Sequence, residues 1–307
     1  MKKCIVTGAN GFVGQSLIRK LNEENVIVYA IIKDENENID SIKDFENVKI
    51  VYCDLADIKK LPEKILERDI DVFYHIAWIS AGGSGRANYN IQLLNTKYAC
   101  DCAEIAKKLN CKKFLCAGTI TEKIAEDVLN LTVKSENIIY GISKHTAHCL
   151  LDIICQSLGL DYIWMQFSNL YGPHSINGNI VQYTIDRLLH NQTAEFGPAN
   201  QPYDLLYIDD LAEQMYLLGK IKMKNNCYYL GSNTPMILKE YLLKIGDIMN
   251  KKNLILIGSK KDDGTRYNSS WFDISPLLKE IGTINFTNFE DGINNTINWI
   301  EVQNNAI

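Results

Sequence analysis

The 307-residue chain contains no run that approaches the roughly 20 consecutive apolar residues of a membrane-spanning helix. It has no excess of basic residues either, since 32 lysines and arginines stand against 37 acidic residues, for a formal net charge of −5. A general affinity for nucleic acid is therefore not expected, because the phosphate backbone attracts basic surfaces. The sequence also lacks internal repeats and low-complexity linkers. We therefore expect a globular protein with neither a membrane nor a nucleic-acid partner.

Metal-ligand spacing is also missing. Only five histidines are present, and none of the nine cysteines pairs with another at the spacing typical of a metal site. The odd number of cysteines and their apolar surroundings indicate reduced thiols in the core. We therefore expect a cytoplasmic protein without a metal site.

What the sequence does contain is a glycine-rich turn near its start. A short apolar run, residues 4–6, precedes Gly8, Gly11 and Gly14, and apolar residues then recur at helical spacing. Gly8 and Gly11 would let the backbone approach a pyrophosphate, and Gly14 would let the helix pack closely on the strand. The amino end of the helix offers free N–H groups to the phosphates. The pattern predicts a dinucleotide site, although glycines in such a turn can also serve packing alone.

A second apolar strand, residues 26–32, ends where this architecture meets the adenosine ribose. An acidic residue there binds the ribose 2′-hydroxyl, whereas a basic group accommodates a 2′-phosphate. Ile32 stands in the position of the acid and Lys33 follows it, which favours NADP(H). The alternative is that Lys33 is a solvated loop residue and Asp34 serves the ribose, which favours NAD(H).

Further apolar strands at residues 48–52, 71–75, 112–117 and 161–167 alternate with helical patterns. This alternation predicts an α/β fold with a Rossmann-type, doubly wound parallel sheet, whose ligand lies along the edge formed by the loops after the strands. We expect a dinucleotide-binding domain over residues 1–168, to which residues 205–220 return. Residues 169–307 are expected to form mainly a smaller C-terminal α/β substrate domain.

Tyr140 and Lys144 lie four residues apart, so their side chains share one face of a predicted helix. Tyrosine is a weak acid at neutral pH, with a reference pKa near 10. A lysine on the same face, together with an oxidised nicotinamide ring, would favour the tyrosinate. Thr119, at the end of the preceding strand, would hydrogen-bond the same substrate oxygen. This set predicts proton exchange coupled to hydride transfer at a nicotinamide.

Together, Thr7-Gly8-x-x-Gly11-x-x-Gly14, Asp54-Leu55, Thr119 and Tyr140-x-x-x-Lys144 resemble the extended short-chain dehydrogenase/reductase family. Residues 169–173 and 207–212 resemble landmarks of its branch acting on nucleotide sugars. The resemblance implies that Thr119, Tyr140 and Lys144 are catalytic. It implies substrate contacts from Arg86, Thr119, Asn169 and Arg266. It implies cofactor contacts from Thr7, Gly8, Asn10, Gly11, Phe12, Val13, Gly14, Lys33, Asp54, Leu55, Ile76, Ala77, Trp78, Asn95, Ala117, Tyr140 and Lys144.

The family contains several reactions. Its 4,6-dehydratases carry Asp and Glu after the active-site Thr, where this chain has Ile120 and Thr121, so dehydration is not expected. The remaining alternatives are an NADPH-dependent 4-keto reductase and a 4-epimerase that keeps NAD bound. Lys33 favours the reductase. Residues 75–78, the glycine-rich loop with Arg86, and Gln92 resemble reductases of deoxysugar and polysaccharide biosynthesis such as CDP-abequose and paratose synthases. A non-catalytic dinucleotide sensor is the alternative from another class. The family also implies a homodimer.

Overall fold

The computed structural model describes residues 1–307 except 132–133, 176–177, 263, 265, 306 and 307. Its largest element is a seven-stranded sheet with the order β11-β6-β5-β4-β1-β2-β3, in which every neighbouring pair is parallel. The order reverses between β1 and β4, as in doubly wound sheets that bind a ligand at that point. The strands are β1 (Lys3–Thr7), β2 (Ile27–Ile32), β3 (Val48–Tyr52), β4 (Val72–His75), β5 (Lys113–Ala117), β6 (Asp161–Phe167) and β11 (Cys227–Leu230).

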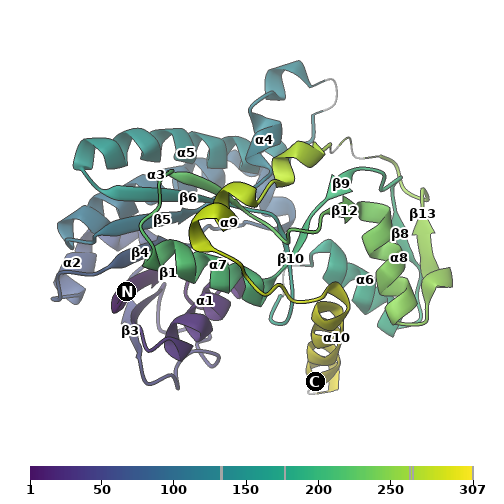
Figure 1. The fold of residues 1–307 in the computed structure, drawn as a ribbon, viewed down its shortest axis with the longest axis horizontal. Coiled ribbons are helices and arrows are strands. Elements are labelled where there is room, and N and C mark those ends of the chain that lie inside the picture. Colours follow the sequence, from purple (N-terminus) through teal and green to yellow (C-terminus); the bar gives the residue numbers. More distant parts are fainter. Residues whose placement is uncertain (132–133, 176–177, 263, 265, 306–307) are drawn as a thin grey trace.

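Helices cover both faces of this sheet (Figure 1). Successive side chains of a strand point to opposite faces, so Cys4 and Val6 join one buried cluster while Ile5 joins the other. The first cluster includes the helices α1 (Phe12–Glu23) and α7 (Ile208–Lys220). The second includes α3 (Tyr89–Lys108) and α5 (Ile138–Leu158), with the shorter η1 (Leu55–Lys60) and α2 (Leu61–Lys64). The predicted α/β, Rossmann-type fold is confirmed.

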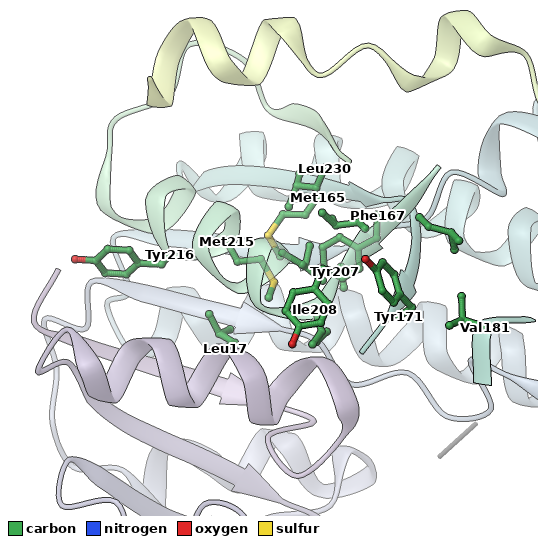
Figure 2. Close-up of a cluster of buried hydrophobic side chains, with 14 of the residues drawn as sticks. Leu17, Met165, Phe167, Tyr171, Val181, Tyr207, Ile208, Met215, Tyr216 and Leu230 are labelled. Atoms are coloured by element: carbon green, nitrogen blue, oxygen red, sulfur yellow. The ribbon is translucent and has the colours of Figure 1, made fainter. Parts of the chain in front are cut away.

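The first cluster extends beyond the sheet into the C-terminal part of the chain. Figure 2 shows Leu17 of α1 near Met215 of α7, with Tyr171 and Val181 farther along the same buried layer. Ser16 of α1 also donates a hydrogen bond to the Ile208 carbonyl, at 3.3 Å. The segment 205–220 therefore packs on the sheet through α7, whereas its first residues form β10 (Leu205–Tyr207), which pairs with β7 (Asn169–Tyr171) in a separate sheet.

The rest of the C-terminal part lies beside the carboxyl edge of the main sheet (Figure 1). It contains two more two-stranded sheets, β12–β9 and β13–β8. β11 from this part joins the main sheet beside β6, which sequence reasoning did not anticipate. The remaining elements are η2 (Gly83–Ala87), α4 (Glu122–Ala125), η3 (Val128–Asn130), α6 (Ile180–Leu189), β8 (Ala194–Phe196), β9 (Pro202–Tyr203), β12 (Met236–Ile237), α8 (Leu238–Ile248), η4 (Lys252–Leu254), β13 (Ile255–Ile257), η5 (Ser269–Phe272), α9 (Ser275–Ile281) and α10 (Phe289–Asn305).

None of the helices in the described residues has the length and apolar character needed to cross a bilayer. Within the same residues, no group of three or more His, Cys, Asp or Glu side chains is arranged to hold a metal ion.

Candidate active site

A cleft of about 740 Å³ opens at the carboxyl ends of the parallel strands, between the main sheet and the C-terminal part. We refer to it as the central cleft. Most of the residues that the sequence assigned to a site line this cleft: Gly8, Asn10, Gly11, Phe12, Val13, Gly14, Ile76, Ala77, Trp78, Arg86, Ala117, Thr119, Tyr140, Lys144 and Asn169. Six do not line it: Thr7, Lys33, Asp54, Leu55, Asn95 and Arg266.

The glycine turn forms one wall of the cleft, and its geometry requires glycine. Gly8 has a φ of +69°, and a Cβ there would lie 2.8 Å from the backbone of Ala77. A Cβ at Gly14 would lie only 2.1 Å from the Gly8 carbonyl oxygen. Gly11 caps α1 without a side chain, so the first N–H groups of the helix face the cleft. This cradle of backbone fits a pyrophosphate.

The Lys33 side chain does not line the cleft. The Lys33 side chain is 61% exposed and lies 3.9 Å from the Asp34 carboxylate, outside the cleft lining. Glu37, five residues beyond the end of β2, lines the cleft instead and accepts a hydrogen bond from Asn10 of the glycine turn, at 3.0 Å. Glu37 lies in an irregular loop, so no periodic pattern in the sequence marks it as a cleft residue. Its one signal in the sequence is its place in the loop that follows the second strand.

Two other expected cofactor contacts have local structural roles. Asp54 caps η1, accepting a hydrogen bond from the Ala56 backbone N–H at 2.9 Å. Thr7 is fully buried, and its hydroxyl lies 2.9 Å from Nδ1 of His75. Burial lowers the pKa of His75 to about 3, so this histidine is a neutral part of the core.

The opposite wall carries the predicted catalytic set. Thr119 follows β5, while Tyr140 and Lys144 lie one turn apart on α5, and all three are more than nine-tenths buried. The Lys144 ammonium donates a hydrogen bond to the Ala117 carbonyl and lies 3.7 Å from the centroid of the Trp78 ring. Burial lowers the pKa of Lys144, and the nearby Tyr140 acts in the opposite direction. The cleft thus brings a phenol, a hydroxyl and a buried ammonium together.

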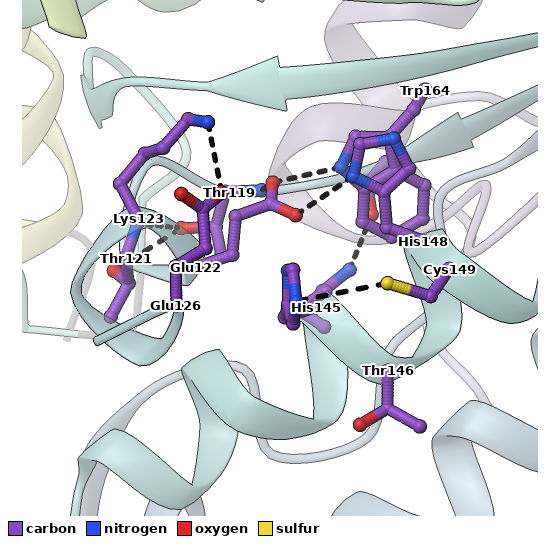
Figure 3. A network of polar contacts seen from close by, with 12 residues as sticks. Thr119, Thr121, Glu122, Lys123, Glu126, His145, Thr146, His148, Cys149 and Trp164 are labelled. Carbon is purple, nitrogen blue, oxygen red and sulfur yellow. Dashed lines mark hydrogen bonds and ion pairs between the residues drawn. The ribbon is translucent and has the colours of Figure 1, made fainter. Parts of the chain in front are cut away.

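A buried carboxylate supports this wall from behind (Figure 3). Glu122, fully buried, accepts hydrogen bonds from Trp164 Nε1 at 2.8 Å and from the Thr119 backbone N–H at 3.4 Å. Its other oxygen lies 3.2 Å from His148 Nδ1, and the His148 ring stacks on Trp164. Burial alone would raise the pKa of Glu122, but the hydrogen bonds from His148 and Trp164 lower it overall. Sequence reasoning missed this group, whose only signal was an acid three residues after Thr119.

The remaining expected contacts lie in three different places: Asn169 in the cleft, Arg266 at the surface and Asn95 in the buried interior. Asn169 lines the cleft, and its buried side-chain N–H group has no hydrogen-bond partner within the described residues. Arg266 is instead an exposed residue paired with Asp262, outside the cleft lining. Asn95 is buried, and its amide bonds both the N–H and the carbonyl of Ile79, at 2.9 and 2.8 Å. It orders the loop that follows β4 and does not reach the cleft.

A glycine cradle at the switch point of a parallel sheet, facing a tyrosine–lysine pair, defines a dinucleotide-binding oxidoreductase of the Rossmann type. Sequence comparison makes this more specific. Residues 4–228 match the model of the NAD dependent epimerase/dehydratase family, and the chain belongs to that family. The predicted resemblance to the extended short-chain dehydrogenase/reductases is thereby confirmed.

Individual relatives differ in their reactions. The chain is 25% identical to a dTDP-4-dehydro-6-deoxyglucose reductase from Escherichia coli, over 96% of each chain. It is 27% identical to a CDP-abequose synthase from Yersinia pseudotuberculosis, over 84% of this chain and 88% of the relative. The fold is similar to that of a UDP-N-acetylglucosamine 4-epimerase from Methanobrevibacter ruminantium M1, with a TM-score of 0.81, 21% identity and coverage of 98% and 99% of the two chains.

Proposed function

We propose that this protein reduces the C4 ketone of a nucleotide-linked 4-keto-6-deoxysugar. The observation that carries the proposal is the placement of Thr119, Tyr140 and Lys144 on the wall opposite the glycine cradle. When bound, the nicotinamide ring supplies the hydride that C4 accepts. The similarity to a dTDP-4-dehydro-6-deoxyglucose reductase and a CDP-abequose synthase, both over most of their lengths, supports this reaction and substrate class.

The residues of the wall divide the proton chemistry among them. Tyr140 donates its phenolic proton to the ketone oxygen, so that the ketone, a hydride and a proton give the alcohol. Thr119 holds the same oxygen by a hydrogen bond from its hydroxyl. Lys144, buried beside them, compensates the negative charge left on the tyrosine oxygen. Solvent then returns the proton to Tyr140.

The structure also supports the expectation that the chain is not a 4,6-dehydratase. Elimination needs an acid in the cleft close to Thr119. Ile120 is apolar and buried, and Thr121 presents a hydroxyl to the cleft. Glu122 is held behind the wall by Trp164 and is absent from the cleft lining. Within the described residues, therefore, no carboxylic acid lines the cleft next to Thr119.

For the cofactor we propose NAD(H), the alternative to the NADP(H) expected from Lys33. A carboxylate accepts hydrogen bonds from a ribose hydroxyl and repels a 2′-phosphate. Glu37 is the charged side chain that lines the cleft beside Asn10, whereas Lys33 lies at the surface. Substituting Glu37→Gln should narrow the preference for NAD(H) over NADP(H) by about tenfold, which corresponds to ~1.4 kcal/mol. Lys33→Gln serves as the matched control, and titration of both cofactors measures the effect.

The position of Glu37 also supports a second candidate, an NAD-dependent 4-epimerase of a nucleotide sugar. An epimerase regenerates its cofactor in each turnover, and a site that selects NAD(H) suits both reactions. The two differ in consumption of the cofactor. A reductase oxidises one NADH for each ketosugar, whereas an epimerase converts a sugar without net change in the cofactor.

The deciding experiment incubates purified protein with NADH and dTDP-4-keto-6-deoxyglucose, and separately with NAD+ and UDP-glucose. We expect stoichiometric NADH oxidation with the ketosugar, which Tyr140→Phe slows by orders of magnitude. Epimerised UDP-sugar and no NADH oxidation would replace the reductase by the epimerase. Tight NAD(H) binding with neither conversion would favour the sensor.

We further propose that the protein is a homodimer. The helices α3 and α5 pack side by side and leave apolar side chains exposed, which is typical of an interface. These are Tyr89, Leu93, Leu94, Ile142, Leu150 and Ile153. Light scattering should give the mass of two chains for the wild type and of one chain for Ile153→Glu. A monomeric wild type would contradict the proposal.

A further inference from the structure

The loop formed by residues 78–86 is held in place by two buried amides of α3, that of Asn95 at Ile79 and that of Gln92 farther along the loop. Gln92, on α3 and fully buried, accepts a hydrogen bond from Trp78 Nε1 at 2.8 Å. Its amide N–H group donates to the carbonyls of Ser80 and Gly85, at 3.2 and 3.1 Å. A Cβ at Gly85 would lie 2.4 Å from that of Ser80, so the loop is closely packed. These contacts therefore fix the backbone position of the next residue, Arg86.

Arg86 uses this position to cover the reacting tyrosine. Its guanidinium carbon lies 4.2 Å from the centroid of the Tyr140 ring, while the Trp78 ring meets Tyr140 edge-on, at 6.3 Å and 89°. Within the described residues Arg86 forms no salt bridge, and its buried Nε atom has no hydrogen-bond partner. The contact of its cationic group with Tyr140 is thus a stacking contact, of the kind that a guanidinium makes with an aromatic ring.

The other charged groups around Tyr140 do not cancel this cation. Lys144, on the same helix, is also a cation. The buried Glu122 of α4 faces away, towards Trp164 and His148. His75, at the end of β4, is a buried neutral base. Tyr140 is therefore flanked by two positive charges, of which sequence reasoning identified only Lys144 as acting on it.

We propose that Arg86 is a positioning residue for Tyr140, which fixes the ring and stabilises the negative charge on its oxygen after proton transfer. The proposal rests on the proposed function of Tyr140 as the proton donor. It differs from the role expected from the sequence, in which Arg86 contacts the substrate. A guanidinium over the ring favours the anion in every step where Tyr140 has lost its proton.

The test measures the ionisation of Tyr140 without any substrate. The near-ultraviolet absorbance of tyrosinate is titrated in wild-type protein and in Arg86→Gln, and each curve is corrected with its Tyr140→Phe counterpart. We expect the Tyr140 transition of Arg86→Gln to move about 0.5–1.5 pH units upward, because removing a cation makes the anion harder to form. Arg86→Lys should show a smaller upward shift. Arg19→Gln, a change of charge on α1 away from the cleft, should show none.

Kinetics then separate positioning from substrate binding. With the ketosugar, Arg86→Gln should lower kcat about 3- to 10-fold and move the alkaline fall of activity upward, with a much smaller change in KM. An unshifted Tyr140 transition together with a raised KM, or with weaker binding of UDP or dTDP, would overturn the proposal and leave Arg86 as a diphosphate ligand. Failure of every ketosugar to react would remove the proposed reductase but not the spectroscopic result. Thermal unfolding of each variant shows whether it is folded.

Discussion

The two walls of the central cleft are built in opposite ways. The glycine turn makes its wall from backbone, and side chains are excluded there because a Cβ at Gly14 would collide with the Gly8 carbonyl. The facing wall is made of side chains, and its ionisable groups, Lys144 and Glu122, are removed from solvent. The comparison shows that the glycine wall requires space free of side chains, whereas the side-chain wall requires partners that compensate its buried charges.

This difference has an energetic consequence. Burying an ion is costly unless hydrogen bonds or opposite charges compensate it. Lys144 is compensated by the Ala117 carbonyl and the face of Trp78, and Glu122 by Trp164 and His148. The side-chain wall is therefore held by interactions that single substitutions can remove, whereas the glycine wall is disrupted when an atom is added.

The largest effect is expected from removing the proposed proton donor, Tyr140, from the side-chain wall. Tyr140→Phe should lower the rate of ketosugar reduction by roughly 10²–10⁴-fold, the usual contribution of general acid–base catalysis. Binding of NAD(H) at the opposite wall should change little, because the glycine turn remains intact. Steady-state kinetics and cofactor titration measure the two quantities. Turnover close to that of the wild type would show that Tyr140 is not the proton donor.

Adding one methyl group to the other wall should affect folding and cofactor binding together. Gly14→Ala places a Cβ 2.1 Å from the Gly8 oxygen, so α1 must move away from β1. We expect a loss of ~3 kcal/mol in the free energy of unfolding and weaker NAD(H) binding. Gly11→Ala is the matched control, because its Cβ would lie 3.3 Å from the same oxygen and needs only a small shift. Denaturant unfolding of both variants measures the contrast, and equal losses would contradict the packing argument.

Removing the carboxylate behind the charged wall should cost less. Glu122→Leu leaves the Trp164 N–H group buried without an acceptor, so we expect a loss of about 1–3 kcal/mol in unfolding free energy. Glu126→Leu, at an exposed ion pair with Lys123, should change stability by less than about 0.5 kcal/mol. Because the pKa of Glu122 is lowered in the folded protein, its contribution is present above the ordinary value of a glutamate and is lost as the pH falls through the folded value.

A comparison of Glu122→Leu with the wild type across acidic pH tests that dependence. The wild type should lose stability below about pH 4.5 more steeply than the variant, because only the wild type must protonate this carboxylate. Urea unfolding at several pH values gives the two curves. Parallel curves would mean that Glu122 is not held ionised by Trp164 and His148.

The same contrast explains which parts of the site were predictable from the sequence. Local patterns predicted the glycine turn, the α/β fold and the shared face of Tyr140 and Lys144, because each depends on spacing along one element. Glu37 and Glu122 were missed because their partners, Asn10 and Trp164, are distant in sequence. Four residues were expected in the site from their sequence positions, yet each has a local or tertiary partner outside the cleft lining. Lys33 pairs with Asp34 and Arg266 with Asp262, while Asp54 bonds the backbone of Ala56 and Asn95 that of Ile79. Spacing along the chain does not encode the direction of a side chain or its tertiary partner, and these determine where the side chains of these residues lie.

The smallest effect on stability is expected at His75. This residue lies beneath the cleft between the two walls, where it contacts Thr7 and stacks on Phe114. The pKa of His75 is lowered from 6.5 to about 3 by burial, so the unfolded chain binds a proton below about pH 6.5 that the folded protein does not. This difference destabilises the fold progressively as the pH falls, by about 2 kcal/mol near pH 5.

His75→Gln should therefore lose less stability than the wild type between about pH 7 and 5, whatever its stability at neutral pH. Urea unfolding measures it, with the exposed His190→Gln as control. An unchanged pH dependence in His75→Gln would show that His75 can take up its proton in the folded state, and that the region between the walls is open to water.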